Sequence, residues 1–313
     1  MPCLLTHYEF FKQVENKPLE IGYLGTQGPD PFFFYGFNFW PTKRAKAIRK
    51  FGDKLHEIDP YITFKFLIDY INDSKSEEKP ILQQYLKGML AHYVLDRNAH
   101  PYVFYLSGFV TKKDKNTKKY FLNHAKVEAS IDSLIMEHYK DTTKTYKALN
   151  HHNYTLKIVS KMLYHLAHDC FNDEFLTKKS YFHSVKTMRT VYRILYTKKG
   201  YKKKFFDKFF KNTPLSAMCE PLVDNIRLDY VNYGRKVWHD CVTGANPRSN
   251  TFYEVFEDAK KDYSKGLKIV QDIFDGHAKA EKLQAYTNNI THHGFEVGAI
   301  KQHFNSIFRN QVD

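Results

Sequence analysis

Apolar residues recur at helical spacing through most of this chain, and no segment convincingly alternates apolar and polar residues as a half-buried strand does. Glycine and proline are also scarce, with 14 and 11 among 313 residues, which argues against an all-β sandwich or barrel. We therefore predict an all-α, multi-helix fold. The pattern places helices at roughly 4–15, 43–57, 60–72, 79–97, 120–140, 154–170, 180–197, 202–211, 217–236 and 251–275.

Proline and glycine mark the interruptions of this pattern. Pro101 directly follows His100, so the helix that begins near residue 79 is expected to end there. The aromatic stretch GYLGTQGPDPFFFYGFNFWP, residues 22–41, contains both residue types and is expected to be a loop that packs against the rest of the domain. The polar residues 111–119 are expected to form a second loop.

The chain is strongly basic, with 48 lysine and arginine residues, 34 aspartate and glutamate residues, and a formal net charge of +14. This charge favours an anionic partner or substrate, such as a phosphate ester, a nucleic acid or an anionic lipid surface. The alternative is a general bias of composition toward Lys, Tyr, Phe, Asn and Ile, which the sequence also fits.

The cysteine positions and the N-terminal residues bear on the cellular compartment of the protein. The four cysteines, at positions 3, 170, 219 and 241, form no CxxC pair and suggest no disulfide framework. The N-terminal residues MPCLLTHYEFF lack the basic and long apolar regions of a signal peptide, and no run approaches the ~18 apolar residues of a spanning helix. We therefore expect a cytoplasmic protein.

One decapeptide, HYVLDRNAHP, places His92, Asp96 and His100 four residues apart. At 3.6 residues per turn these positions drift by only about 40°, so the three side chains point the same way from one helix. The segment HAKVE carries a second pair at this spacing, His124 and Glu128, which is how one helix presents two ligands to a metal ion. Imidazole and carboxylate together suit zinc. Without an ion, these carboxylates are costly to place on faces that are otherwise apolar.

Three further residues of the same type stand in aromatic or apolar surroundings. They are His7 in LLTHYEF, Asp30 in QGPDP and His56 in FGDKLHEID. Four other histidines have no place in this metal set and are interpreted as structural: His165, His168, His292 and His293.

The chain resembles the zinc-dependent phospholipase C superfamily in five motifs, which occur in this order over roughly residues 2–132: THYEF, LGTQGPDPFFFYG, LHEID, LKGMLAHYVLDRNAHPY and NHAKVEASID. That superfamily also includes single-strand-specific zinc nucleases and the catalytic domain of glycosylphosphatidylinositol-specific phospholipase D. The resemblance implies a largely helical domain with up to three zinc ions in one cleft. We accordingly expect one domain over residues 1–313, with its metal-binding core in 1–140, a helical remainder in 141–276 and a polar tail in 277–313.

Carried over position by position, the resemblance implies three zinc sites. The first is expected between Asp30, His56, His92 and Asp96, and the second between His100, His124 and Glu128. The third is expected between His7, Asp96 as a bridge, and the amino-terminal nitrogen, which belongs to Pro2 if Met1 is removed. In many members the next ligand histidine comes six residues after this aspartate, whereas here it comes four residues after it, from Asp96 to His100, as in the phospholipase D type domain.

The resemblance further implies a hydrolase in which a zinc-activated water attacks phosphorus, with Asp30 orienting or deprotonating that water. The expected reaction is a phospholipase C-like cleavage of a phospholipid or a related phosphoester. Two alternatives stay open. One is a single-strand nuclease or nucleotidase that uses the same zinc site, and the other is a non-catalytic, membrane-associated zinc protein.

The segment KKGYKKKFFDKFFK, residues 198–211, places Phe205, Phe206, Phe209 and Phe210 on one helical face among seven lysines. One interpretation is a helix that lies on an anionic membrane surface as a peripheral contact. The other is an ordinary amphipathic helix that buries its phenylalanine face in the core. The second is the more common use of such a pattern and is the one that we expect.

Overall fold

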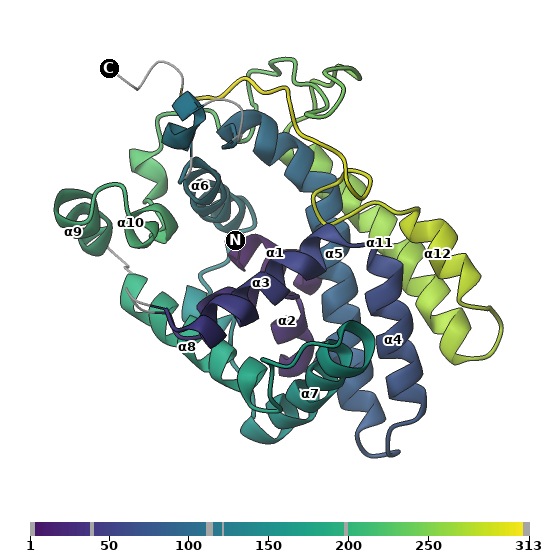
Figure 1. The fold of residues 1–313 in the computed structure, drawn as a ribbon. Helices are drawn as coiled ribbons and strands as arrows, with labels where there is room; N and C mark the ends of the chain where they lie inside the picture. The colour runs from purple at the N-terminus through teal and green to yellow at the C-terminus, as the bar shows by residue number, and fades with distance from the viewer. Residues whose placement is uncertain (1–3, 38–40, 111–114, 121, 197–199, 309–313) are drawn as a thin grey trace.

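The computed structural model describes residues 4–37, 41–110, 115–120, 122–196 and 200–308. Within these ranges it contains twelve α-helices and, apart from two isolated bridges, no β-structure, so the all-α prediction is confirmed. The helices are α1 (Leu4–Val14), α2 (Glu20–Gly25), α3 (Lys43–Glu57), α4 (Pro60–Asn72), α5 (Lys79–Ser107), α6 (Asn123–His138), α7 (Asn153–His165), α8 (Ser180–Leu195), α9 (Tyr201–Phe209), α10 (Pro214–Met218), α11 (Phe252–Phe274) and α12 (Glu281–Thr287) (Figure 1). A short 3-10 helix, η1 (Asp30–Phe34), also contributes to the site described below.

Helices α3 and α4 begin and end where the sequence predicts them, at 43–57 and 60–72. Their starts are set by local capping groups. The Thr42 hydroxyl accepts a hydrogen bond from the N–H of Ala45 at 3.1 Å, and the Asp59 carboxylate does the same at the start of α4. Such caps are readable from sequence, because they depend only on neighbouring residues.

The long helix α5 forms the centre of the domain and contacts α1, α2, α4, α6, α7 and α11 (Figure 1). Its buried residues lie all around the helix, as expected for a helix enclosed by others. It continues through Pro101 to Ser107, so the predicted end near His100 is wrong. Tyr102, just beyond the proline, is buried, and such packing offsets the roughly 3 kcal/mol cost of a proline inside a helix. The helix ends instead at Ser107, and the next residue, Gly108, has a φ of +71° that glycine adopts readily. None of the described helices combines the length and apolar composition needed to cross a bilayer.

Glycines allow α2 to lie directly against α5. A Cβ atom on Gly88 would stand 2.1 Å from the backbone oxygen of Gly22, so the two backbones meet with no side chain between them. This close approach brings the turn that follows α2 over the face of α5 that carries His92.

The predicted loop at 22–41 is wrong in part. Most of α2 and all of η1 lie within it, whereas residues 38–40 are outside the described ranges. The expected packing of this segment is confirmed, because Phe32 and Phe34 are buried against α8 and α3. Its glycine and proline content concealed two short helical turns.

The helix predicted at 217–236 is also wrong. Helix α10 ends at Met218, ahead of Pro221, and proline disfavours helical geometry in the residue before it. Further along, Asn232 adopts a left-handed φ of +58° that a continuous helix excludes. The chain there is mostly irregular.

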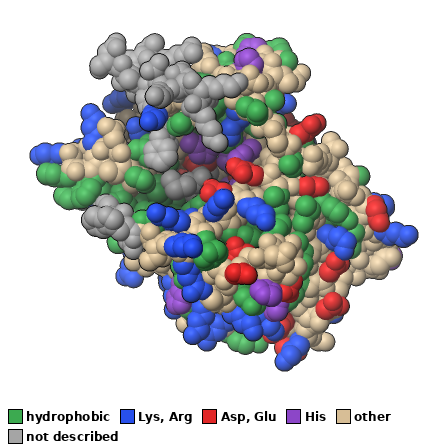
Figure 2. Space-filling view, in the orientation of Figure 1, with side chains coloured by type: hydrophobic (Ala, Val, Ile, Leu, Met, Phe, Trp, Pro, Cys, Tyr) green, Lys and Arg blue, Asp and Glu red, His purple; other side chains and the backbone are tan. Residues whose placement is uncertain are grey.

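Residues 277–308 form α12 and then a segment that returns to the C-terminal end of α5, shown in yellow in Figure 1. The N–H groups of Asn305 and Ile307 donate to the carbonyl oxygens of Tyr105 and Leu106 at 3.1 and 2.9 Å. This returning segment passes beside a hollow in which histidine side chains reach the surface (Figure 2).

Candidate metal centre

Helix α5 presents three polar side chains on one face, as their spacing predicts. His92, Asp96 and His100 are almost fully buried, with 1, 6 and 7% of each residue exposed. The Nε2 atom of His92 lies 3.1 Å from Oδ2 of Asp96, and Nδ1 of His100 lies 3.8 Å from Oδ1. Asp96 is therefore the central carboxylate of the helix.

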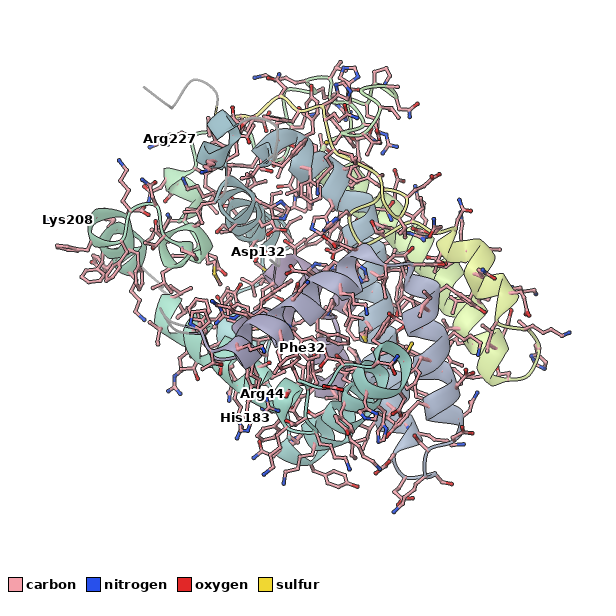
Figure 3. The ribbon with its side chains drawn as sticks, viewed as in Figure 1. Phe32, Arg44, Asp132, His183, Lys208 and Arg227 are labelled. Atoms are coloured by element: carbon pink, nitrogen blue, oxygen red, sulfur yellow. The ribbon has the colours of Figure 1, made fainter. Side chains whose placement is uncertain are left out.

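Helix α1 brings His7 to the same carboxylate. Its N-terminus is capped from α6 by Asp132, which accepts hydrogen bonds from the N–H groups of Leu5 and Thr6 at 3.1 and 2.8 Å (Figure 3). With the helix start fixed in this way, Nε2 of His7 lies 3.1 Å from Oδ1 of Asp96.

The turn after α2 brings Asp30 into the hollow by passing very close to α5. Gly28 in this turn has a φ of +49°, and a Cβ atom there would stand 2.3 Å from Cδ2 of His92. Only glycine therefore fits both the conformation and the space. Asp30 follows as the first residue of η1 and is 2% exposed, with its Oδ1 atom 3.2 Å from Nε2 of His56 in α3.

Helix α6 supplies the second predicted pair. Nε2 of His124 lies 2.9 Å from Oε1 of Glu128, which is also 3.6 Å from Nε2 of His100 on α5. Because α5 and α6 pack together, residues from two helices meet at one carboxylate.

The described residues form three groups whose potential ligand atoms lie within 4.8 Å of one another: Asp30, His56 and His92; His7, His92 and Asp96; and His100, His124 and Glu128. Each buried group can hold a metal ion. All eight described residues of the predicted ligand set take part, and His92 belongs to two groups. The ninth, Pro2, lies outside the described residues.

Backbone carbonyls orient three of the histidines. Nδ1 of His56 lies 2.8 Å from the oxygen of Gly52, Nδ1 of His92 lies 2.9 Å from that of Thr26, and Nδ1 of His100 lies 2.7 Å from that of His292. Because a carbonyl oxygen only accepts, each Nδ1 carries a proton and donates it, and Nε2 of a neutral ring then presents a lone pair. The three Nε2 atoms face carboxylate oxygens of Asp30, Asp96 and Glu128, at 3.2, 3.1 and 3.6 Å. Lone pairs at these distances repel unless a proton or a metal ion lies between them.

The carboxylates of the centre are held in their charged form. Burial alone would raise the pKa of Asp96, but the charges of His100 and His92 and the hydrogen bonds to it hold the pKa well below its ordinary value. Burial likewise opposes ionisation of Glu128, but the charge of His124, together with hydrogen bonds from His100 and His124, lowers the pKa of this carboxyl. For His100, burial is outweighed by these two carboxylates, so its pKa is raised. The carboxylates are therefore in the ionised form that metal binding requires.

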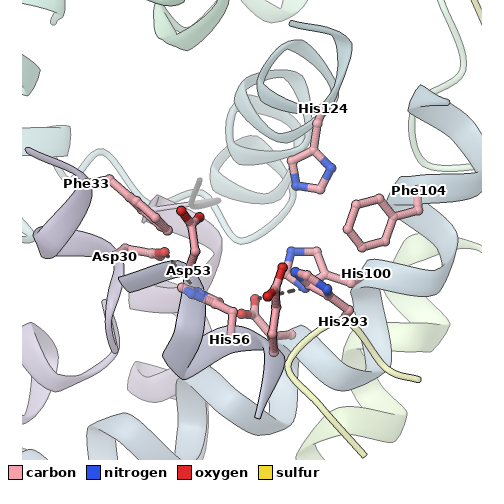
Figure 4. A pocket seen from close by; sticks show the side chains of 10 residues that line it. Asp30, Phe33, Asp53, His56, His100, Phe104, His124 and His293 are labelled. Carbon is pink, nitrogen blue, oxygen red and sulfur yellow. Dashed lines mark ion pairs between the residues drawn. The ribbon is translucent and has the colours of Figure 1, made fainter. Parts of the chain in front are cut away.

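These groups open into a cavity of about 100 Å³ (Figure 4). It is lined by Asp30, Phe33, Asp53, His56, Glu57, Asp96, His100, Phe104, His124 and His293. A space of this size holds several water molecules or a small anionic group.

Half of the cavity lining was not among the predicted site residues: Phe33, Asp53, Glu57, Phe104 and His293. Asp53 and Glu57 lie one turn before and one residue after His56 on α3, so helical spacing could have found Asp53. No local pattern could have found His293, which the C-terminal segment carries to the cavity.

His292 and His293, which were interpreted as structural, lie directly beside the centre. The backbone oxygen of His292 orients His100, and the ring of His293 lies 5.8 Å from that of His100. Burial lowers the pKa of both residues well below the ordinary value, so both rings are neutral. They remain outside the three ligand groups but complete the wall around them.

No family model, no curated protein and no solved structure matches this chain. The class of site is therefore defined by its geometry, which is a buried histidine–carboxylate centre that can hold metal ions.

Proposed function

We propose that this chain is a zinc-dependent phosphodiester hydrolase with a phospholipase C-like reaction. One observation carries the proposal. Three histidines, each oriented through Nδ1 by a backbone carbonyl, direct Nε2 toward ionised carboxylates beside a cavity. A purely structural histidine–carboxylate pair needs neither three converging copies nor an open cavity.

The donor set favours zinc over other common ions. Each group combines imidazole nitrogen with carboxylate oxygen, which is a usual zinc environment. Calcium and magnesium prefer oxygen ligands alone, and copper(I) prefers thiolates and thioethers. The backbone carbonyls on Nδ1 also match the outer contacts that orient zinc-binding histidines. The three groups agree with the up to three ions that the resemblance implies, although Nε2 of His92 can serve only one of its two groups at a time.

When bound, zinc supplies Lewis-acid charge that acidifies water and neutralises the oxygens of a phosphoryl group. Asp30, which is buried but lines the cavity, then has a defined task. It accepts a hydrogen bond from a water molecule, orients that water toward phosphorus and takes its proton as the new P–O bond forms and the ester P–O bond breaks. His56, 3.2 Å away, keeps the Asp30 carboxylate in position.

The substrate we propose is a phospholipid or a related phosphoester. The net charge of +14 favours an anionic substrate, and the cavity has room for a phosphoryl group while the rest of the ester stays outside. A nucleotide or single-stranded nucleic acid is the second candidate, because the rings of Phe33 and Phe104 lie in the cavity wall, where a base could stack.

Metal analysis of the purified protein is the first test. We expect up to three zinc ions per chain. A folded protein that contains no zinc, and whose melting temperature is unchanged by a chelator, would contradict both hydrolase candidates. Bound zinc without hydrolysis of any phosphoester would instead favour a non-catalytic zinc protein.

A substrate panel with a matched pair of variants is the second test. Phosphatidylcholine, phosphatidylinositol and single-stranded DNA are assayed side by side for the wild type, Asp30→Asn and Asp169→Asn. Asp169 also contacts two histidines, His165 and His168, but lies exposed outside the centre. We expect Asp30→Asn to lower the rate by at least about 100-fold and Asp169→Asn to leave it unchanged. Full activity of Asp30→Asn would refute the assigned role.

A further inference from the structure

Helix α9 exposes three aromatic side chains along one face. Tyr201, Phe205 and Phe209 follow one another at four-residue steps, and 69, 51 and 62% of each residue is exposed. Phe206 is the only buried residue of the helix. The expectation that segment 198–211 buries its phenylalanine face in the core is therefore wrong for Phe205 and Phe209. An exposed aromatic row of this length is costly in water and needs an explanation.

The opposite side of α9 is firmly attached to the domain. The Lys203 ammonium donates to the backbone oxygen of Ser216 in α10 at 3.1 Å, and the Ser216 hydroxyl donates to Asp207 at 2.6 Å. Phe206 packs on the same side. Because α10 also contacts α6, which carries His124, the exposed face is held in a fixed relation to the metal centre.

Lysines surround the exposed rings. Lys204 and Lys208 are exposed on α9, and Lys208 places Nζ 5.2 Å from the centroid of the Phe209 ring. The Lys202 ammonium instead donates to the backbone oxygen of Ile194 in α8 at 2.7 Å. Hydrophobic and basic side chains lie together at the left edge of Figure 2, and Lys208 projects from this edge in Figure 3. Asp207 is the single acidic residue of the helix, and it is engaged by Ser216 on the inner side.

We propose that this aromatic–lysine face, formed by Tyr201, Lys204, Phe205, Lys208 and Phe209, binds the surface of an anionic lipid bilayer. The rings enter the boundary between headgroups and acyl chains, where half-exposed aromatic residues gain burial, and the ammonium groups contact lipid phosphates. A second copy of this chain is a poor occupant, because a symmetric contact would bring the lysines of both copies together. The inference stands independently of the proposed hydrolase function.

Vesicle co-sedimentation of the full chain tests this proposal. The wild type is mixed with phosphatidylcholine vesicles that contain or lack phosphatidylserine. We expect binding to the anionic vesicles that weakens as salt is raised, and little binding to neutral ones. Hydrolysis of a soluble phosphodiester, bis(p-nitrophenyl) phosphate, is followed in parallel. It should be equal in every variant below, so a failure of membrane binding and a failure of the hydrolase proposal are told apart.

Two pairs of variants separate the aromatic and the charge contributions. The double variant Phe205→Ser with Phe209→Ser should bind the anionic vesicles at least about tenfold more weakly. The control variant Tyr154→Ser, which removes an equally exposed ring on α7, should bind them like the wild type. Lys204→Gln with Lys208→Gln should also weaken this binding about tenfold. The control for charge is Lys157→Gln with Lys161→Gln, two exposed lysines at the same spacing on α7.

Three outcomes overturn the proposal. The first is equal binding by the α9 variants and their controls. The second is a wild type that ignores anionic vesicles and instead forms an oligomer that Phe205→Ser with Phe209→Ser dissociates, as light scattering would show. The third is a wild type that binds single-stranded DNA through Lys204 and Lys208 but binds no vesicles.

Discussion

An alanine at position 28 would disturb the candidate metal centre through a single added atom. Its Cβ would stand 2.3 Å from Cδ2 of His92, whereas ordinary contacts begin at 3.4 Å. The imidazole would therefore have to retreat by about 1 Å. His92 belongs to two of the three ligand groups, and its Nδ1 is bonded to the oxygen of Thr26, so a shift of the ring would disturb both this hydrogen bond and the position of Nε2.

Two costs follow from this substitution and can be measured separately. The left-handed φ of +49° costs alanine roughly 1–2 kcal/mol of stability. The displaced ligand should weaken zinc binding by about 10- to 100-fold, which is the effect of losing an outer contact that orients a metal-binding histidine.

Gly276→Ala is the matched control. Gly276 has a φ of +73°, so alanine pays a similar conformational cost, but no heavy atom lies within 4 Å of the added Cβ. Zinc affinity is measured by competition with a chromophoric chelator, and stability is measured by thermal unfolding. We expect both variants to melt at a lower temperature and only Gly28→Ala to lose zinc affinity. Wild-type zinc affinity in Gly28→Ala would refute the assignment of His92 as a metal ligand.

Three further tests use pH, a helix cap and a chelator. Burial, with a smaller effect of the Asp132 charge, raises the pKa of Glu220 from 4.5 to about 8. The folded state therefore favours the protonated carboxyl, and the contribution of this group to stability is complete below about pH 4.5 and is lost as pH rises toward 8. Glu220→Gln should therefore raise the free energy of unfolding at pH 8 by on the order of 3 kcal/mol and change it little near pH 4.5. Chemical denaturation at the two pH values measures this difference, and an equal effect at both would contradict it. Asp132→Ala leaves the buried N–H groups of Leu5 and Thr6 without their acceptor, so it should lower the free energy of unfolding by about 1–3 kcal/mol. It should also weaken one of the zinc sites. Unchanged stability would show that the cap does not hold α1. A chelator should lower the melting temperature and added zinc should restore it, because an ion that binds only the assembled ligand groups stabilises the folded state. An unchanged melting curve would refute metal binding at these groups.

The features that the sequence predicted well are those that local spacing determines. The bounds of α3 and α4 follow from their caps, and the common face of His92, Asp96 and His100 follows from the pitch of a helix. The predictions failed where distant packing decides the outcome. Pro101 stays inside α5 because the residues beyond it are buried by other elements, and no neighbouring residue reveals this.

Segment 198–211 is a second case in which distant packing decided the outcome. Its amphipathic pattern was correct, but the pattern alone does not say whether an apolar face meets the core or the solvent. The decision depends on Ser216 and Asp207, which attach the other side of α9 to α10 and leave Phe205 and Phe209 outside.

The groups that complete the metal centre are the ones that sequence analysis is least able to find. Gly52, Thr26 and His292 act through their backbone oxygens, and every residue of a chain has such an oxygen. Their effect is nevertheless decisive, because donating Nδ1–H to a carbonyl is what leaves each Nε2 atom to face a carboxylate. Because His292 is the partner of His100, the C-terminal segment is part of the centre and not only a cover for it. A metal site inferred from ligand spacing alone therefore includes the atoms that bind and omits those that orient them.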